Sequence, residues 1–136
     1  MDKERLATQL EAHPDYRVVR RLETLREGPA LVGSTVRHAA IVDTETTGTD
    51  HAVDKVIELA VVVFEYCAAT GAVGRVLGVY DGLEDPGVPI PASSTAIHGI
   101  TDAMVAGQRI DDGSVASLLD GVGLVIAHNA GFDRKF

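Results

Sequence analysis

The sequence has one cysteine, Cys67, so the chain cannot form an internal disulfide bond. A single thiol also excludes a zinc site built from several cysteines, and a chain without disulfides fits a reducing compartment. We expect Cys67 to act as a small apolar residue on a strand.

Long apolar runs are also missing. No stretch of about 18 apolar residues, the length of a membrane-spanning helix, occurs in the 136 residues. The first 27 residues carry too many charges for a secretory signal, so we expect a cytoplasmic protein with no membrane partner. The chain length and the 46% of hydrophobic residues suffice for one globular domain.

Positive charge is scarce, because 12 Lys and Arg stand against 20 Asp and Glu, for a net charge of −8. Residues 1–27 hold six of each sign, so the remainder carries the whole excess. Two interpretations stay open. The carboxylates could form a solvated acidic surface, or some of them could gather around divalent cations, which invert the local charge.

The chain divides into three regions by composition. In residues 1–27, apolar residues recur among charges at helical spacing and Pro14 interrupts them, which predicts an amphipathic helical extension of two short helices. This extension could pack on the domain or bind a partner. Residues 28–36 are expected to be a linker, because Gly28, Pro29 and Gly33 punctuate them. Residues 37–136 carry the apolar pattern of a domain.

Within that domain the pattern predicts a mixed α/β fold. Apolar segments at residues 37–48, 55–66 and 74–82 are expected strands, and the turn residues Thr70 and Gly71 make the three an antiparallel meander. Short helices are expected at residues 93–101, with Ser or Thr at its start, and at 112–121, and Thr101 or Asp102 could cap another helix. A short buried strand at residues 122–130 should lead into the first turns of a helix at residues 131–136.

Asp43 and Glu45 lie two residues apart at the end of the first predicted strand. Alternation along a strand points both carboxylates to the same face. Two neighbouring carboxylates repel and are poorly solvated beside a core, and a Mg²⁺ or Mn²⁺ ion is the usual compensation. Taken alone, the pair is weak evidence for a metal, because strand ends also carry acids for capping and solubility.

Two motifs in a fixed order sharpen this interpretation. The segment "IVDTETTG" is followed by "VIAHNAGFDRKF", and "AIHGIT" lies between them. Together they resemble the first motif, the nucleotide-pocket segment and the second motif of the DEDD-type 3′-5′ exonucleases. This is the family of the proofreading epsilon subunit of bacterial DNA polymerase III and its relatives. The resemblance covers roughly residues 38 to 136.

The resemblance implies an RNase H-like exonuclease fold and two-metal hydrolysis, with Mg²⁺ or Mn²⁺, at the 3′ end of single-stranded DNA. It also implies a set of catalytic, metal-binding carboxylates, namely Asp43, Glu45 and Asp133. The terminal nucleotide is implied to contact Thr46, Thr47 and Gly48 through the backbone, and His98 and Phe132 through their side chains.

Other roles stay open for some of these residues. His98 could simply cap a helix or bond a carbonyl, and Phe132 could belong to the core. Asn129 is expected to fix the turn between strand and helix through backbone hydrogen bonds. His51, in a loop rich in Asp, is expected at the surface.

The sequence departs from the family pattern after the second motif. Complete members carry a third motif, with a His or Tyr as general base and a last metal-binding Asp, and neither residue follows Asp133 here. The chain thus resembles a C-terminally truncated member. We expect little activity from it, because losing a general base costs about 10²- to 10⁴-fold in rate. A sheet without its later helices is also expected to expose apolar side chains.

A smaller departure concerns the substrate. Ser93 stands where proofreading relatives often place a glutamate that touches the terminal sugar, so RNA stays open beside DNA.

Two other functions also stay open. Asp43 could be the nucleophile of a phosphatase, although Glu45 and the "HNAGFD" segment argue against it. A catalytically inactive exonuclease-like module could instead bind nucleic-acid ends or a polymerase partner, with residues 1–27 as its docking element.

Overall fold

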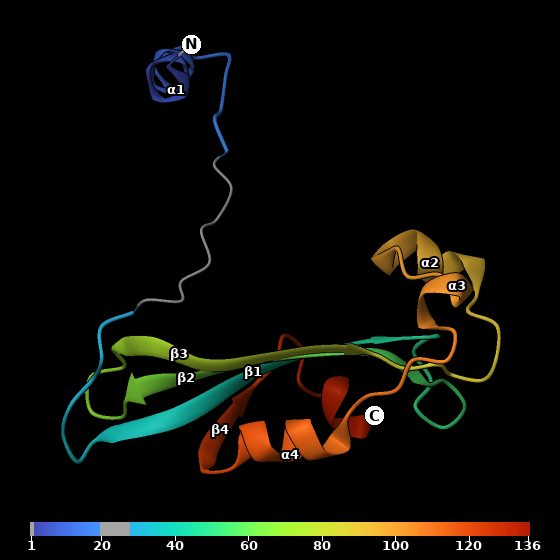
Figure 1. Cartoon of the computed structure of the whole chain (residues 1–136). Coiled ribbons are helices and arrows are strands. Elements are labelled where there is room, and N and C mark those ends of the chain that lie inside the picture. The colour runs from blue at the N-terminus through green and yellow to red at the C-terminus, as the bar shows by residue number, and fades with distance from the viewer. Residues whose placement is uncertain (1, 20–27) are drawn as a thin grey trace.

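The computed structural model describes residues 2–19 and 28–136. In chain order the elements are α1 (Lys3–Glu11), β1 (Val36–Thr46), β2 (Val56–Cys67), β3 (Val73–Leu83), α2 (Ala92–His98), α3 (Asp102–Val105), α4 (Asp112–Leu119), β4 (Val122–Ile126) and the 3₁₀ turn η1 (Asp133–Lys135). Figure 1 shows a long, twisted sheet with α4 along one side and with α2 and α3 together at one end.

The described residues form one four-stranded sheet in the order β3-β2-β1-β4. The pairs β1–β2 and β2–β3 are antiparallel, which confirms the predicted meander, and β4 lies parallel to β1. β2 is dense in Val and Ile, whose branched side chains favour the pleated backbone. The predicted mixed α/β fold is therefore confirmed.

Two separate apolar clusters stabilise this sheet. Ala40, Val61 and Val63 are buried on the face covered by α4, where Leu118 and Leu119 pack against them. This side of the sheet is called the α4 face below. The second cluster joins the end of the sheet to α2 and α3 and consists of Ile57, Ile90, Ile100 and Val105, with Leu83 packed beside them.

The expectation of a buried fourth strand was wrong. In β4, Leu124, Val125 and Ile126 remain 42%, 60% and 41% exposed. β4 is an edge strand that pairs only with β1 in the described part of the chain, so its apolar side chains receive little cover. Ile41 on the central strand β1 is also 47% exposed, as expected for an incompletely covered sheet.

Two helix starts differ from the sequence-based expectation. α2 begins after Pro91, without a side-chain cap, and Ser94 Oγ donates instead to the carbonyl of Thr47. Thr101 is the N-cap residue of α3 but makes no capping bond, while Asp102 Oδ1 accepts from the backbone N–H of Ile90. In both cases a tertiary contact takes the polar side chain that local capping would have used.

The N-terminal extension is only partly helical in the described residues. α1 is capped by Asp2, and within Lys3–Glu11 no residue is buried. Figure 1 shows this helix away from the sheet. Residues 12–19 form turns and extended chain, and the rest of the second predicted helix lies outside the described residues. No helix in the described ranges is long and apolar enough to cross a membrane.

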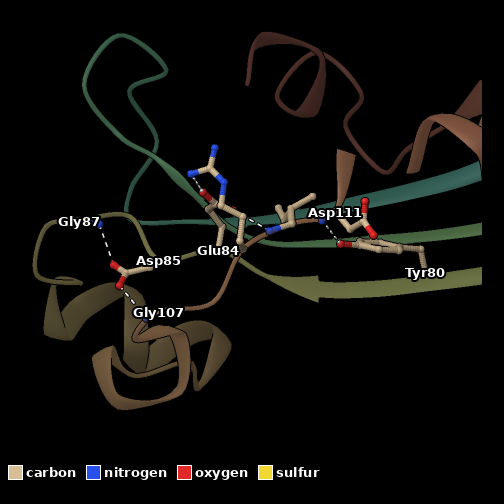
Figure 2. A network of polar contacts seen from close by, with 8 residues as sticks. Tyr80, Glu84, Asp85, Gly87, Gly107 and Asp111 are labelled. Carbon is tan, nitrogen blue, oxygen red and sulfur yellow. Dashed lines mark hydrogen bonds and ion pairs between the residues drawn. The ribbon is translucent and has the colours of Figure 1, made fainter. Parts of the chain in front are cut away.

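A set of polar contacts fastens the connection between α3 and α4 to the end of β3 (Figure 2). The side chains of Tyr80, Glu84 and Asp85 accept hydrogen bonds from backbone N–H groups at 2.7–2.9 Å. The donors are Gly87, Gly107, Ile110 and Asp111. The bonds from Gly107 and Gly87 hold the pKa of Asp85 below its usual value. The loop at residues 107–111 is thereby fixed beside the sheet.

Cys67, at the end of β2, is more than the small apolar residue expected. Its thiol lies 3.5 Å from the hydroxyl of Thr35. Hydrogen bonds from Thr35 and Thr70, followed by backbone N–H groups, lower the pKa of Cys67 to about 7. These donors stabilise the thiolate, which is the reactive form of cysteine.

Replacing Ile57 with alanine should destabilise the protein by about 2–5 kcal/mol, because Ile57 is fully buried where the sheet meets α2 and α3. Urea unfolding followed by circular dichroism measures the loss. The matched control is Ile97→Ala on α2, since Ile97 is 86% exposed and should change stability little. Equal effects of the two substitutions would contradict the assigned core.

Alkylation of Cys67 by iodoacetamide should accelerate as the pH rises through about 7, because the pKa of the thiol is lowered to about 7. Thr35→Val removes the hydrogen bond that contributes most to lowering the pKa of Cys67, and it should move the midpoint of the rate profile to higher pH. A midpoint near pH 8.5, the ordinary value for cysteine, in both proteins would contradict the described contacts.

Candidate functional site

Asp43 and Glu45 lie at the C-terminal end of β1 and, by strand alternation, point to the side of the sheet opposite the α4 face. Asp43 is exposed and Glu45 is half-buried. Apolar residues precede them because β1 is a central strand, and the chain turns away directly after Thr46. The strand therefore delivers two carboxylates to the rim of the sheet.

Two further carboxylates, which the sequence analysis missed, belong to the same group. Glu58 on β2 is the direct partner of Glu45, and Asp81 on β3 lies in the row of Asp43 across Ala60. Partial burial is the main cause that raises the pKa of Glu58, followed by the negative charges of Asp81, Glu45 and Asp43. The side of the sheet that carries these four residues is called the acidic face below. The grouping of these four carboxylates follows from the register between the strands and is not visible in the sequence.

Asp133 does not join this group in the structure. Its Oδ1 accepts a hydrogen bond from Thr44 Oγ1 at 2.8 Å, and Thr44 alternates with Asp43 and Glu45 onto the α4 face. Within residues 2–19 and 28–136, no three His, Cys, Asp or Glu side chains gather closely enough to hold a metal ion. The structure thus brings Asp43 and Glu45 to one face and leaves Asp133 on the other.

The turn after β1 presents its backbone and hides its side chains. Thr46 and Thr47 are 7% and 4% exposed. The hydroxyl of Thr46 donates to the carbonyl of Gly48, and that of Thr47 donates to Asp54. The hydroxyl groups are therefore engaged within the protein, and a ligand at this turn would meet the main chain.

His98 ends α2 and lies near the acidic face, since its charge would lower the pKa of Glu58. Its Nδ1 accepts from the backbone N–H of Ile100 at 3.0 Å, so the ring proton of the neutral form is on Nε2. Nε2 is buried and finds no partner in the described part of the chain. A buried donor without an acceptor is costly, so this atom is ready to donate to a bound molecule.

Phe132 is half-buried and packs against Phe136, with ring centroids 5.0 Å apart. A shallow groove beside it is lined by the turn residues Thr49 and His51 and by Asn129. Asn129 has a positive φ of 57°, and its carbonyl accepts from the backbone N–H of Phe132. The segment after β4 therefore lies beside the turn that follows β1.

The donor chemistry fits a divalent cation to a limited extent. Asp43, Glu45 and Glu58 offer carboxylate oxygens, the ligands that Mg²⁺ and Mn²⁺ prefer, on one face of the sheet. Partial burial, and after it the negative charges of the neighbouring carboxylates, raise the pKa of Glu58, and a cation would relieve the repulsive part. Asp43 and Glu45, with Glu58 beside them, are thus the residues that could hold a metal.

Comparison with known sequences identifies relatives of this domain. The model of the exonuclease family matches residues 40–136. A DNA polymerase III subunit epsilon-like protein of Rhodobacter capsulatus is 41% identical over 106 residues, which cover 71% of this chain and 13% of that protein. The PolC-type DNA polymerase III of Listeria innocua is 34% identical over 98 residues, covering 71% of this chain and 6% of that protein. The chain thus spans a small part of these relatives.

Solved structures agree with the sequence matches. Exonuclease X, in complex with 5′ overhanging duplex DNA, is 32% identical, with a TM-score of 0.50 over 71% of this chain and 52% of that chain. Exonuclease I shares the fold at 18% identity, with a TM-score of 0.56 over 73% of this chain and 22% of that chain. The sheet described above is accordingly the RNase H-like sheet of these nucleases, and the chain belongs to the exonuclease family.

Proposed function

We propose that this chain is a metal-dependent 3′-5′ exonuclease domain that hydrolyses the terminal phosphodiester bond of single-stranded DNA. The observation that carries the proposal is the placement of Asp43 and Glu45 together on the acidic face, opposite Glu58. Three carboxylates side by side on β1 and β2 are costly without a counter-charge, and a nuclease uses that counter-charge on its substrate.

Asp43 and Glu45 would hold two divalent ions, Mg²⁺ or Mn²⁺. The ions would activate water and stabilise the departing 3′ oxygen of the cleaved phosphodiester. They would also make an acidic face attractive to a polyanion, which reconciles the function with a net charge of −8. Glu58 adds negative charge beside the pair and thereby strengthens its attraction for cations.

The neighbouring groups would hold the end of the nucleic acid. The main chain of Thr46, Thr47 and Gly48 would lie against the terminal nucleotide, while the Nε2–H of His98 donates to one of its oxygens. Phe132 offers an aromatic face on which a base of any sequence can stack. These contacts would recognise the end of the nucleic acid and would not distinguish the edges of the bases. RNA therefore stays open as a substrate beside DNA.

Asp133 is proposed as the third metal-binding carboxylate. To take this role, its bond with Thr44 must open and residues 129–136 must move to the acidic face. A cation on Asp43 and Glu45 would favour the movement, because it attracts a third carboxylate where the metal-free face repels one.

A module that binds nucleic-acid ends without cleaving them is the second candidate. It is favoured by the separation of Asp133 from the other carboxylates in this structure. In this case residues 1–27 would be the docking element for a polymerase partner. They include α1, within which no residue is buried. The two candidates differ in whether bound DNA is shortened.

With Mn²⁺ and a 5′-labelled single-stranded oligonucleotide, the 136-residue chain should shorten the strand from its 3′ end. We expect this 136-residue chain to act about 10²- to 10⁴-fold more slowly than Exonuclease X assayed alongside, because its residues 134–136 supply neither the His nor the Tyr that would serve as general base. Asp43→Asn should abolish the shortening, whereas Asp50→Asn, an exposed acid in the nearby loop, should retain it.

Shortening that survives Asp43→Asn would contradict the catalytic role of Asp43. Binding of the oligonucleotide without any shortening would favour the second candidate. A rate equal to that of Exonuclease X would refute the proposed impairment. The rate of the protein purified from its native source can be compared with that of Exonuclease X in the same assay.

Glu58→Gln should raise the Tm of the metal-free protein at pH 7 by about 1–4 °C, a range that allows for solvent screening of a cross-strand like-charge pair. Because the pKa of Glu58 is raised in the folded protein, its ionisation destabilises the fold. This destabilisation is absent below the ordinary pKa of a glutamate and is complete once the pH has risen above the pKa of Glu58 in the folded protein. The gain should therefore vanish near pH 4.

The same substitution should reduce the stabilisation that Mn²⁺ gives to the wild-type protein, as measured by thermal melts in EDTA and in Mn²⁺. Asp120→Asn, at an exposed acid beyond α4, is the control and should change neither melt. If Glu58→Gln lowered the metal-free Tm at pH 7, the ionised Glu58 side chain would not destabilise the folded protein, and the burial and repulsion that raise its pKa would be contradicted.

A further inference from the structure

The turn after β1 is held from inside by Asp54, a residue to which the nuclease site described above assigns no role. Asp54 Oδ1 accepts from the hydroxyl of Thr47, and its Oδ2 accepts from the backbone N–H of Asp50, both at 2.9 Å. The Thr47 hydroxyl in turn accepts from the backbone N–H of Lys55 at 3.0 Å. One half-buried carboxylate thus fixes two points of the turn.

Gly48 shows how closely Asp54 supports the main chain. A Cβ added at Gly48 would lie 2.5 Å from Asp54 Oδ2 and 2.7 Å from Asp54 Cγ. A side chain at position 48 would therefore displace the Asp54 carboxylate, which occupies the inner side of the turn. With the inner side filled by Asp54, a ligand can approach the main chain only from the outer side.

Ser94 connects the same turn to α2. Its hydroxyl donates to the carbonyl of Thr47 at 2.7 Å, and His98 lies four residues further along the helix, on the same helical face. Thr47 is thus fixed through its hydroxyl by Asp54 and through its carbonyl by Ser94. This bond therefore links the turn to the helix that ends at His98, whose buried Nε2 has no partner in the described residues.

We propose that Asp54 and Ser94 are positioning residues for the pocket that takes the 3′-terminal nucleotide. Asp54 sets the shape of the main chain at Thr47 and Gly48, and Ser94 sets the distance from that main chain to His98. The inference rests on the proposed function. Both residues act through the turn, because the oxygens of Asp54 already accept protein donors and the Ser94 hydroxyl already donates to a carbonyl.

The test compares binding of two oligonucleotides that differ only at the 3′ end, one with a hydroxyl and one with a phosphate. Fluorescence anisotropy in Ca²⁺ measures both affinities, calorimetry with Mn²⁺ measures metal binding, and a thermal melt reports folding. Asp54→Ala removes two bonds within the turn, and Ser94→Ala removes the one bond that joins α2 to the carbonyl of Thr47. The matched controls are Asp50→Asn in the same loop and Ser117→Ala on α4, both at exposed positions.

Both alanine variants should bind the 3′-hydroxyl oligonucleotide about tenfold more weakly, as expected for the loss of a fixed hydrogen-bonded contact. Their affinity for Mn²⁺ and for the 3′-phosphate oligonucleotide should stay within about twofold of the wild type, because the acidic face is untouched. Asp54→Asn keeps one acceptor and should lie between wild type and Asp54→Ala. Both controls should match the wild type.

Four other results would overturn the inference. Unchanged preference for the 3′-hydroxyl end in both alanine variants would show that neither residue positions the pocket. Parallel losses of Tm, Mn²⁺ binding and both oligonucleotide affinities in Ser94→Ala would show a general structural role. A wild-type protein that binds Mn²⁺ without preferring a 3′-hydroxyl end would refute the proposed end recognition itself. A wild-type protein that binds neither Mn²⁺ nor either oligonucleotide would refute the proposed function.

Discussion

The antiparallel register of β1 against β2 is the constraint on which the rest of the site depends. It sets Glu45 opposite Glu58 and places Asp43 beside Ala60, so that the acids of three strands meet on one face. A shift of one residue along β2 would send Glu58 to the α4 face and the core valines Val61 and Val63 into solvent. The apolar core therefore enforces an arrangement of carboxylates that their own charges oppose.

This opposition explains how an acidic protein can belong to a nuclease family. Repulsion among carboxylates lowers stability when cations are absent and becomes binding energy when they are present. The apolar clusters on the α4 face and at the end of the sheet supply the stability that the acidic face gives up. The four carboxylates of the acidic face contribute to the net charge of −8, and the match to the exonuclease family shows that such a charge is compatible with this fold.

The sequence predicted the elements better than their surroundings. Periodicity located β1, β2 and β3, because these central strands need continuous apolar side chains. It also placed β4, but a run of Val, Leu and Ile does not tell whether another element will cover it, and β4 proved to be exposed. The capping preference of Ser94 gave way to the carbonyl of Thr47, a partner far away in the sequence.

For the site, the spacing of Asp43 and Glu45 sufficed to place both on one face, whereas Glu58 and Asp81 needed the register between strands. The position of Asp133 did not follow from the motif, because its hydrogen-bond partner is Thr44, a residue distant in the sequence that alternates onto the α4 face. Asp54 gave no signal in the sequence, since its role lies in the space beside Gly48.

The parallel pairing of β1 with β4 also bears on the order in which the molecule assembles. The three strands of the meander are neighbours in the chain, so their hairpins close short loops and can form early. β4 reaches β1 only after the intervening helices have been placed, at the entropic cost of closing a long loop. The strand that carries Asp43 and the segment that carries Asp133 would thus be joined in a late folding step. A chain with a complete meander would have the acidic face but would not yet have Asp133 beside β1.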